Sequence, residues 1–273
     1  MKKVFALILT ALLVLSLAAC SQEGNSSQGS GSTAGEKDLL AQIKERGTLI
    51  IATEGNWAPW TYHDETDALV GLDVEIGKLI AEGLGVKAEF AETTWDSILS
   101  GVKAGRFDIA CNGVGYSEER AQSYNFSDPY VYDRTVLVVH KDNTDIQSFE
   151  DLSGKMTTNS PNSLYADKAI ALGAEVTYVD TLNETLAMVQ DGRVDATLNA
   201  EVSINDYLKE HPDAPLKIVA RGEGAPIAYP VMKDASTETL IAEINRILEE
   251  ARKDGTLAAI SIKYFGFDMT TPE

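Results

Sequence analysis

Residues 94–112, TWDSILSGVKAGRFDIACN, have a counterpart in residues 181–199, TLNETLAMVQDGRVDATLN. The identical pairs are Thr94/Thr181, Leu99/Leu186, Val102/Val189, Gly105/Gly192, Arg106/Arg193, Asp108/Asp195 and Asn112/Asn199. Each copy has the pattern of a helix that begins after a capping Thr, ends at a Gly and leads into a short apolar strand. Chance is the alternative, because a Gly-Arg-x-Asp turn between helix and strand is chemically natural. We interpret the repeat as two lobes of the same βαβ construction.

From Lys37 onward, short apolar runs alternate with segments of helical period, which indicates an α/β fold. The expected strands are Thr48–Thr53, Lys87–Ala91, Phe107–Cys111, Arg134–His140, Glu175–Val179, Val194–Leu198, Leu216–Val219 and Ile227–Met232. Amphipathic helices are expected over residues 73–84 and 240–251. In open α/β sheets ligands bind beyond the carboxyl ends of the strands, and Asn112 and Asn199 both follow a strand. The pattern therefore predicts a binding cleft between the lobes.

The candidate anion site is the stretch ACNGVGYSEER, residues 110–120. Its glycines let the backbone approach a ligand, and N–H groups at a helix start attract anions. The planar guanidinium of Arg120 could then hold a carboxylate with two parallel hydrogen bonds. The alternative for Arg120 is a surface ion pair with Glu118 or Glu119.

Two tryptophans, Trp57 and Trp95, fall on the expected cleft side and could form aromatic walls for a small ligand, although core packing is their alternative. Trp60 is expected in the core, and Cys111, inside an apolar strand, is expected to be a buried structural thiol. The sequence has no Gly-x-Ser-x-Gly or Cys-x-x-Cys motif, and its three histidines are scattered. We therefore expect no catalytic residue, no metal site and no cofactor.

The composition excludes several partner classes. With 23 Lys+Arg against 42 Asp+Glu, the formal charge of −19 disfavours nucleic acid and docking of a basic face on anionic lipid. An apolar fraction of 44% with 24% charged residues is typical of a globular protein. Two cysteines allow at most one disulfide, so the chain is no disulfide scaffold.

The N-terminus predicts export. Residues 1–19 combine two lysines, an apolar run and small residues, as in a signal peptide. Leu17-Ala18-Ala19-Cys20 resembles the bacterial lipobox, which implies that Cys20 carries a diacylglyceryl thioether and palmitate; an ordinary cleaved signal is the alternative. Residues 20–36 then form a lipidated Cys and a flexible Gly/Ser-rich linker. Cleavage would leave a formal charge of −21, because Lys2 and Lys3 are removed.

Residues 40–268 resemble a bacterial extracellular solute-binding protein of family 3, the polar amino acid type. The matching stretches are Gly47–Thr53, Trp57–Trp60, Val70–Ile76, Trp95–Leu99, Gly105–Ile109, Ser117–Arg120, Phe126–Tyr130 and Asp151–Lys155. The resemblance implies a two-lobed periplasmic-binding-protein fold of type II, the Venus flytrap, with the ligand in the cleft. It implies a first lobe over residues 37–138 and 228–273, with residues 139–227 inserted as the second.

The resemblance also implies roles for individual residues. Arg120 would hold the ligand's α-carboxylate, assisted by Asn112, Gly113 and Gly115 from the first lobe and by Ser163 from the second. Trp57 and Trp95 would contact the ligand side chain, and Glu54 would lie at the pocket mouth.

Two positions depart from the pattern of an ordinary α-amino acid site. Gly115 replaces the Thr or Ser of many relatives. The second-lobe acid that usually binds the α-ammonium falls on Ala200, and neighbours 199 and 201 would face away because side chains alternate along a strand. Glu201, through a bulge, or Glu54 could supply the missing charge.

The resemblance implies the substrate-binding component of an ABC importer, not an enzyme. It would bind an amino acid or a related small carboxylate and deliver it to permease subunits that work with a cytoplasmic ATPase. We expect a monomer, lipid-anchored to the cell membrane on its extracytoplasmic face. The alternatives are a cyclohexadienyl-type dehydratase on the same fold and a ligand-sensing module for a membrane receptor.

Overall fold

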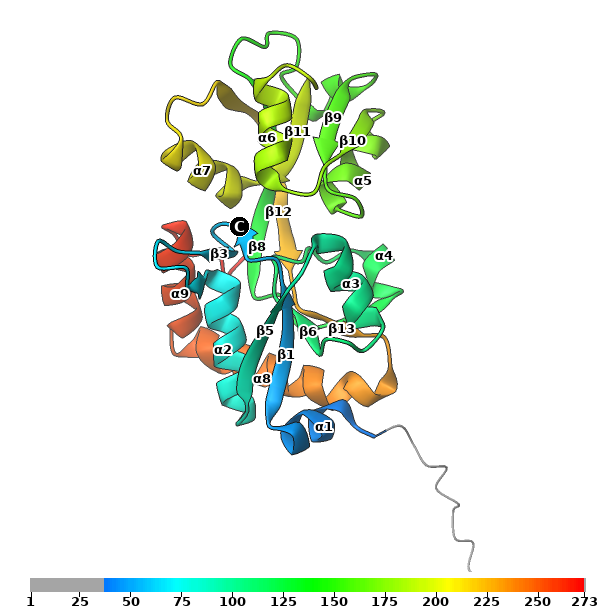
Figure 1. Cartoon of the computed structure of the whole chain (residues 1–273), viewed down its shortest axis with the longest axis vertical. Coiled ribbons are helices and arrows are strands. Elements are labelled where there is room, and N and C mark those ends of the chain that lie inside the picture. Colours follow the sequence, from blue (N-terminus) through cyan, green and yellow to red (C-terminus); the bar gives the residue numbers. More distant parts are fainter. Residues whose placement is uncertain (1–36, 273) are drawn as a thin grey trace, which may run out of the picture. The chain divides into compact units, whose positions relative to one another are not determined.

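The computed structural model describes residues 37–272, so the predicted signal peptide, Cys20 and the whole of the predicted linker lie outside the described residues. Residues Glu36–Glu273 form one compact unit. Within this unit, Figure 1 shows two lobes joined by two long strands, β8 (Val131–His140) and β12 (Leu216–Ile227).

The first lobe is built on a parallel sheet with strand order β5-β1-β6. Its strands and the helices between them are β1 (Thr48–Thr53), α2 (Leu72–Leu84), β5 (Lys87–Glu92), α3 (Trp95–Lys103) and β6 (Ile109–Ala110). Helix α1 (Leu39–Arg46) precedes the sheet, while α8 (Glu238–Lys253) and α9 (Thr256–Phe265) pack against α2. Smaller elements complete it: β2 (Asn56–Trp57), β3 (Thr61–His63), β4 (Leu69–Val70), α4 (Glu118–Ala121), β7 (Tyr124–Phe126), β13 (Pro230–Met232) and a 3-10 turn η2 (Ala235–Thr237).

The second lobe has a five-stranded sheet with order β10-β9-β11-β8-β12. Strands β9 (Met156–Asn159), β10 (Glu175–Tyr178) and β11 (Ala196–Ala200) are parallel, whereas β8 and β12 run antiparallel to their neighbours. The remaining elements are η1 (Phe149–Leu152), α5 (Leu164–Ala171), α6 (Leu182–Gln190) and α7 (Glu201–Glu210).

The sequence repeat has a structural basis in both lobes. Asp108 Oδ2 accepts a hydrogen bond from the backbone N–H of Ile50 over 2.7 Å, at the neighbouring strand β1. Asp195 Oδ2 accepts one from Met156 N–H over 2.8 Å, at the neighbouring strand β9. The repeated Asp therefore anchors the adjacent strand in each lobe, which supports two copies of one βαβ construction.

Core packing changes along β8. Val131 belongs to the large apolar cluster of the first lobe, whereas Val136 and Leu137 belong to clusters of the second. The change falls a few residues before the expected lobe boundary at residue 138. Strand β12 extends to Ile227, so both crossings lie within paired strands. The lobe boundaries stay predictions at the level of single residues.

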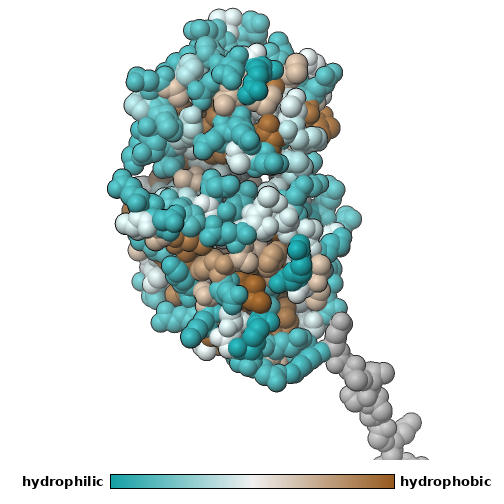
Figure 2. Space-filling view, in the orientation of Figure 1, coloured by the Kyte–Doolittle hydropathy of each residue, from teal (hydrophilic) through white to brown (hydrophobic). Residues whose placement is uncertain are grey.

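The expected core residues are buried: Trp60 and Cys111 have no exposed surface. Hydrophilic residues cover most of the face in Figure 2, and apolar residues gather in smaller patches, chiefly over the first lobe. Within residues 37–272, no helix has both the length and the hydrophobicity to cross a membrane.

Candidate ligand-binding site

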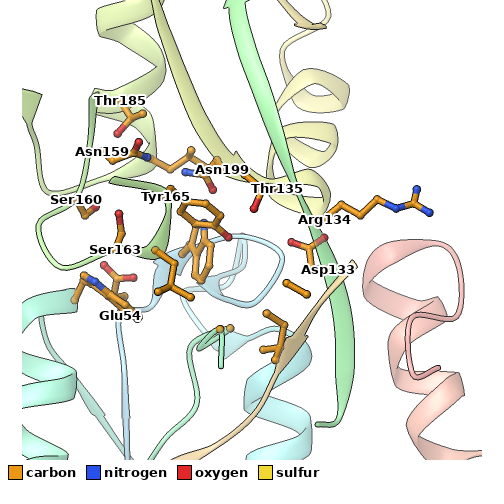
Figure 3. Close-up of a pocket in the computed structure, with 18 of the residues that line it drawn as sticks. Glu54, Asp133, Arg134, Thr135, Asn159, Ser160, Ser163, Tyr165, Thr185 and Asn199 are labelled. Carbon is orange, nitrogen blue, oxygen red and sulfur yellow. The ribbon is translucent and has the colours of Figure 1, made fainter. Parts of the chain in front are cut away.

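A pocket lies between the two lobes and takes its walls from both (Figure 3). It encloses about 830 Å³ of empty space, part of it open to solvent. Seven of the residues expected at the site line it: Glu54, Trp57, Trp95, Gly113, Gly115, Arg120 and Ser163.

Arg120 connects the lobes at this pocket. Its Nη1 donates to the Gly115 carbonyl and its Nη2 to the Asn162 carbonyl, both over 2.9 Å. The guanidinium carbon lies 5.4 Å from the centre of the Trp95 ring. Burial lowers the pKa of Arg120, and the charge of nearby Asp167 partly offsets this. The expected alternative, a surface ion pair with Glu118 or Glu119, is not found among the ion pairs of the described residues.

The aromatic wall of the pocket packs against a buried ring. Trp57 stacks on the buried Trp60 with 5.6 Å between ring centres, and Trp95 is 9% exposed. Gly113 lies against both rings: a Cβ there would approach Trp57 to 2.8 Å and Trp60 to 2.9 Å. Its φ of +55° is also in the region that favours glycine. The close approach of backbone to aromatic wall therefore requires glycine at this position.

Gly113 is further fixed by a buried carboxylate. Its N–H donates to Asp73, whose other oxygen accepts from the Tyr229 hydroxyl over 3.1 Å. Burial raises the pKa of Asp73 to about 6, although the hydrogen bonds from Gly113 and Tyr229 act in the opposite direction. Tyr229 follows β12, so this network ties the pocket loop to one of the crossing strands.

Asn112 does not line the pocket, so the expected direct contact between Asn112 and the ligand is not supported. Its side chain is fully buried, with Oδ1 accepting from Thr53, Thr61 and the Glu54 N–H. Its Nδ2 donates to Glu54 Oε2 over 2.7 Å. Burial raises the pKa of Glu54 to about 7, although this bond and one from the Trp95 backbone lower it. Asn112 thus positions Glu54.

Glu201 also lies outside the pocket wall. Its two carboxylate oxygens form ion pairs with Arg221 and with Arg134, the latter over 3.8 Å. It is the first residue of α7, and no bulge turns it toward the ligand. The expectation that Glu201 supplies the missing negative charge is therefore not supported.

At the end of β11, Asn199 lines the pocket, as its place at the end of a strand predicts. Ala200 is fully buried and is not among the residues that line the pocket. It pairs with Thr135, a pocket residue of β8, so the two side chains lie on the same face of the sheet. The alanine therefore leaves this face of the sheet without the acid that the resemblance implies at position 200.

Several residues that line the pocket were not expected from the sequence. The polar ones are Asn56, Asp133, Arg134, Thr135, Asn159, Ser160, Tyr165, Asp180 and Thr185. Three buried polar atoms in the pocket wall lack a hydrogen-bond partner: Trp95 Nε1, Asp133 Oδ1 and Asn159 Oδ1. Such atoms are costly unless a ligand or water satisfies them. The pocket is therefore built for a polar molecule that brings both donors and acceptors.

No group of His, Cys, Asp and Glu side chains suited to a metal ion occurs within residues 37–272. Burial raises the pKa of the free thiol of Cys111 well above its usual value, in keeping with a structural role. The site chemistry is that of binding: one guanidinium, aromatic faces and polar groups from two lobes.

Comparisons with known proteins agree with this geometry. The profile described as bacterial extracellular solute-binding proteins, family 3, matches residues 49–267. A probable amino-acid ABC transporter-binding protein of Haemophilus influenzae is 40% identical over 85% of this chain and 90% of its own length. The L-cystine-binding protein TcyA of Bacillus subtilis is 40% identical over 99% of this chain and 100% of its own.

Solved structures agree as well. An ancestral arginine-binding protein bound to arginine is 37% identical with a TM-score of 0.75, over 81% of this chain and 99% of its own. The L-cystine solute receptor of Neisseria gonorrhoeae, in its unliganded open conformation, is 40% identical and has a TM-score of 0.58. This match covers 85% of this chain and 99% of the receptor chain.

Proposed function

This chain belongs to family 3 of the bacterial extracellular solute-binding proteins, and we propose that it is the extracytoplasmic substrate-binding component of an ABC importer for an amino acid. Its relatives are binding proteins of ABC transporters and not enzymes, so the dehydratase alternative is not favoured. The observation that carries the proposal is Arg120, a partly buried cation in the pocket that bonds to backbone carbonyls of both lobes.

The mechanism follows from contacts made only when the lobes are closed. A carboxylate on Arg120 adds ligand contacts to a residue that already bridges Gly115 and Asn162. Ligand binding therefore favours the closed arrangement over the open one. A shift from mostly open to mostly closed requires a differential affinity of about 10⁴-fold, or about 5.5 kcal/mol. The closed form would then be the one that the permease subunits recognise.

The test is calorimetric titration of the purified protein with L-cystine, L-arginine and L-glutamine. The amino-free carboxylates 3,3′-dithiodipropionate and 5-guanidinopentanoate follow as comparison ligands. Binding of at least one amino acid supports the proposal. Binding of the amino-free carboxylates alone would contradict the amino acid assignment, and binding of none would contradict the proposed function.

We further propose that the protein is a monomer held at the outer face of the cell membrane by lipid on Cys20, after removal of residues 1–19. The motif at residues 17–20 and the Gly/Ser-rich segment that follows support this. Labelling of growing cells with radioactive palmitate should mark the wild type but not Cys20→Ser, which should be released into the medium or periplasm. Labelling of Cys20→Ser would refute this anchor.

A further inference from the structure

Asp133 is a buried carboxylate in the wall of the ligand pocket. It lies on β8, one of the two strands that join the lobes, and is 4% exposed. Its Oδ1 has no hydrogen-bond partner within the described residues. In Figure 3 the carboxylate lies on the crossing strand beside the other labelled pocket residues. A buried carboxylate oxygen without a partner is costly, so this one is suited to a donor from the ligand.

The charged neighbours of Asp133 do not supply the hydrogen-bond donor that its Oδ1 lacks. The next residue, Arg134, extends away from the other labelled pocket residues in Figure 3, and its Nη1 lies 3.8 Å from Glu201. Burial raises the pKa of Asp133 to about 7; the charge of Glu201 adds to this, while Arg134 and backbone N–H groups lower it. A cationic group placed against Asp133 would therefore be strongly favoured over an empty pocket.

Asp133 and Arg120 line the same pocket. Ala225 on β12 pairs with Asp133, and Ile227, two residues further, forms a bridge with Gly115. The Gly115 carbonyl accepts the hydrogen bond from Arg120. Both charges shift the pKa of the Tyr165 phenol. Burial raises this pKa most, Asp133 raises it further, and Arg120 lowers it. A cation and an anion thus flank Tyr165 in one cavity.

This pair of opposite charges matches the head group of a zwitterion. We propose that Asp133 binds the ammonium group of the ligand while Arg120 binds its carboxylate, so that the site selects molecules with both groups on one head. The inference rests on the proposed function and deepens it by assigning the ammonium partner. It also accounts for Ala200, which pairs with Thr135 on β8: the acid comes from β8 instead of β11.

Other acids of the pocket are poorer candidates. Both contacts of Glu54 with Asn112 are already formed, through Oε2 and through the backbone N–H. Asp180 is exposed to solvent at the pocket edge, where an ion pair is screened and weak. Among the pocket acids, only Asp133 has a buried oxygen without a partner.

The experiment compares Asp133→Asn with wild type at pH 8, where the carboxylate is ionised and an α-amino group is still largely protonated. The probes are L-cystine against 3,3′-dithiodipropionate, L-arginine against 5-guanidinopentanoate and L-glutamine against 4-carbamoylbutanoate, which differ by the α-amino groups. The control is Glu119→Gln, which removes one negative charge beside Arg120 but lies outside the pocket wall and is exposed. Glu54→Gln tests the rival acid.

In wild type the amino acid that binds should bind about 100-fold more tightly than its amino-free counterpart. Asp133→Asn should weaken the amino acid about 100-fold and change the amino-free carboxylate less than 3-fold. Glu119→Gln should keep the wild-type preference.

The inference is overturned if Asp133→Asn weakens both partners of a pair equally, if it leaves the preference intact, or if Glu54→Gln removes the preference instead. Wild type that binds no probe refutes the proposed function itself, and the inference with it. A thermal melt of unliganded Asp133→Asn, expected to be at least as stable as wild type at pH 8, shows that lost binding is not lost folding.

Discussion

The Asn162 side chain joins the two lobes, because its Nδ2 donates a hydrogen bond to Asp96 Oδ1 over 2.6 Å. Asp96 lies in the first turn of α3 in the first lobe, and Asn162 precedes α5 in the second. The carbonyl of the same Asn162 accepts from Arg120. Its φ of +57° is unusual for a residue other than glycine. One residue therefore contributes to lobe closure and to the position of the guanidinium.

Asn162→Gly should weaken ligand binding about 5-fold, or about 1 kcal/mol, mainly through faster dissociation. Glycine keeps the positive φ, so the change removes only the hydrogen bond to Asp96. Stopped-flow measurement of ligand release gives the rate. Asp96→Ala removes the same bond from the other lobe, so the double variant should be no weaker than either single variant. Fully additive effects would show that the bond is not what holds the cleft closed.

Arg120→Lys and Arg120→Ala should both weaken binding by more than about 100-fold, because neither offers a carboxylate two parallel donors. The unliganded protein should lose less than about 3 °C of its thermal midpoint. Titration calorimetry and thermal melts measure the two effects. Arg106 is the matched control: its guanidinium also lies 5.4 Å from an aromatic ring, that of Phe107, but outside the pocket. Equal losses in Arg106→Ala and Arg120→Ala would argue against a direct role for Arg120.

The repeat predicted the architecture because each copy carries its own structural signals. Thr181 caps α6 in a capping box with Glu184, and Gly105 and Gly192 both have positive φ after their helices. Strand β9 was missed because its buried residues Thr157, Thr158 and Asn159 are polar and give no apolar pattern. Their burial is decided by tertiary hydrogen bonds, such as that from Thr197 to the Thr158 carbonyl.

The site was predicted where a local motif carries the chemistry, as in the loop of Gly113, Gly115 and Arg120. Asp133 was missed because the expected strand begins at Arg134, whereas β8 begins at Val131 and includes Asp133. Its place in the pocket wall depends on the pairing of β8 with β11 and β12, which no local motif encodes.

The stability gained from Asp133→Asn should depend on pH. The raised pKa of Asp133, about 7, means that the folded state holds its proton more tightly than the unfolded chain. The contribution of protonated Asp133 to the free energy of folding is therefore fully present below about pH 4, and it is lost as the pH rises to about 7. Arg134, Glu201 and Tyr165 are the charged or titratable groups that interact with it.

Asp133→Asn should accordingly raise the thermal midpoint of the unliganded protein by a few degrees at pH 8 and by little at pH 4.5. Melts across this range measure the difference between the two proteins. Glu119→Gln, at an exposed acid, should show no such trend. A stabilisation equal at both pH values would mean that the buried charge is not its cause.

Affinity for an amino acid should fall about 10-fold between pH 8 and pH 6, because a carboxylate with a pKa of about 7 must be ionised to bind an ammonium group. The pKa of Glu54 is also about 7, so wild type alone does not identify the acid. The diagnostic quantity is the slope of log Kd against pH in Asp133→Asn, which should be flatter than in wild type. An unchanged slope would assign the titration to Glu54.

Gly115→Ala should weaken binding about 10-fold through a contact that exists only across the cleft. A Cβ at Gly115 would lie 2.8 Å from Leu164 Cδ1, which belongs to α5 in the second lobe. No other atom comes closer than 3.9 Å, and the φ of Gly115 is not positive, so the backbone tolerates alanine. Overpacking of this kind costs about 1–3 kcal/mol in the closed form and nothing in an open one. Leu164→Ala in the same chain should recover most of the affinity, as titration calorimetry would measure. Failure of Leu164→Ala to recover it would mean that the carbonyl of Gly115, which holds Arg120, has moved instead.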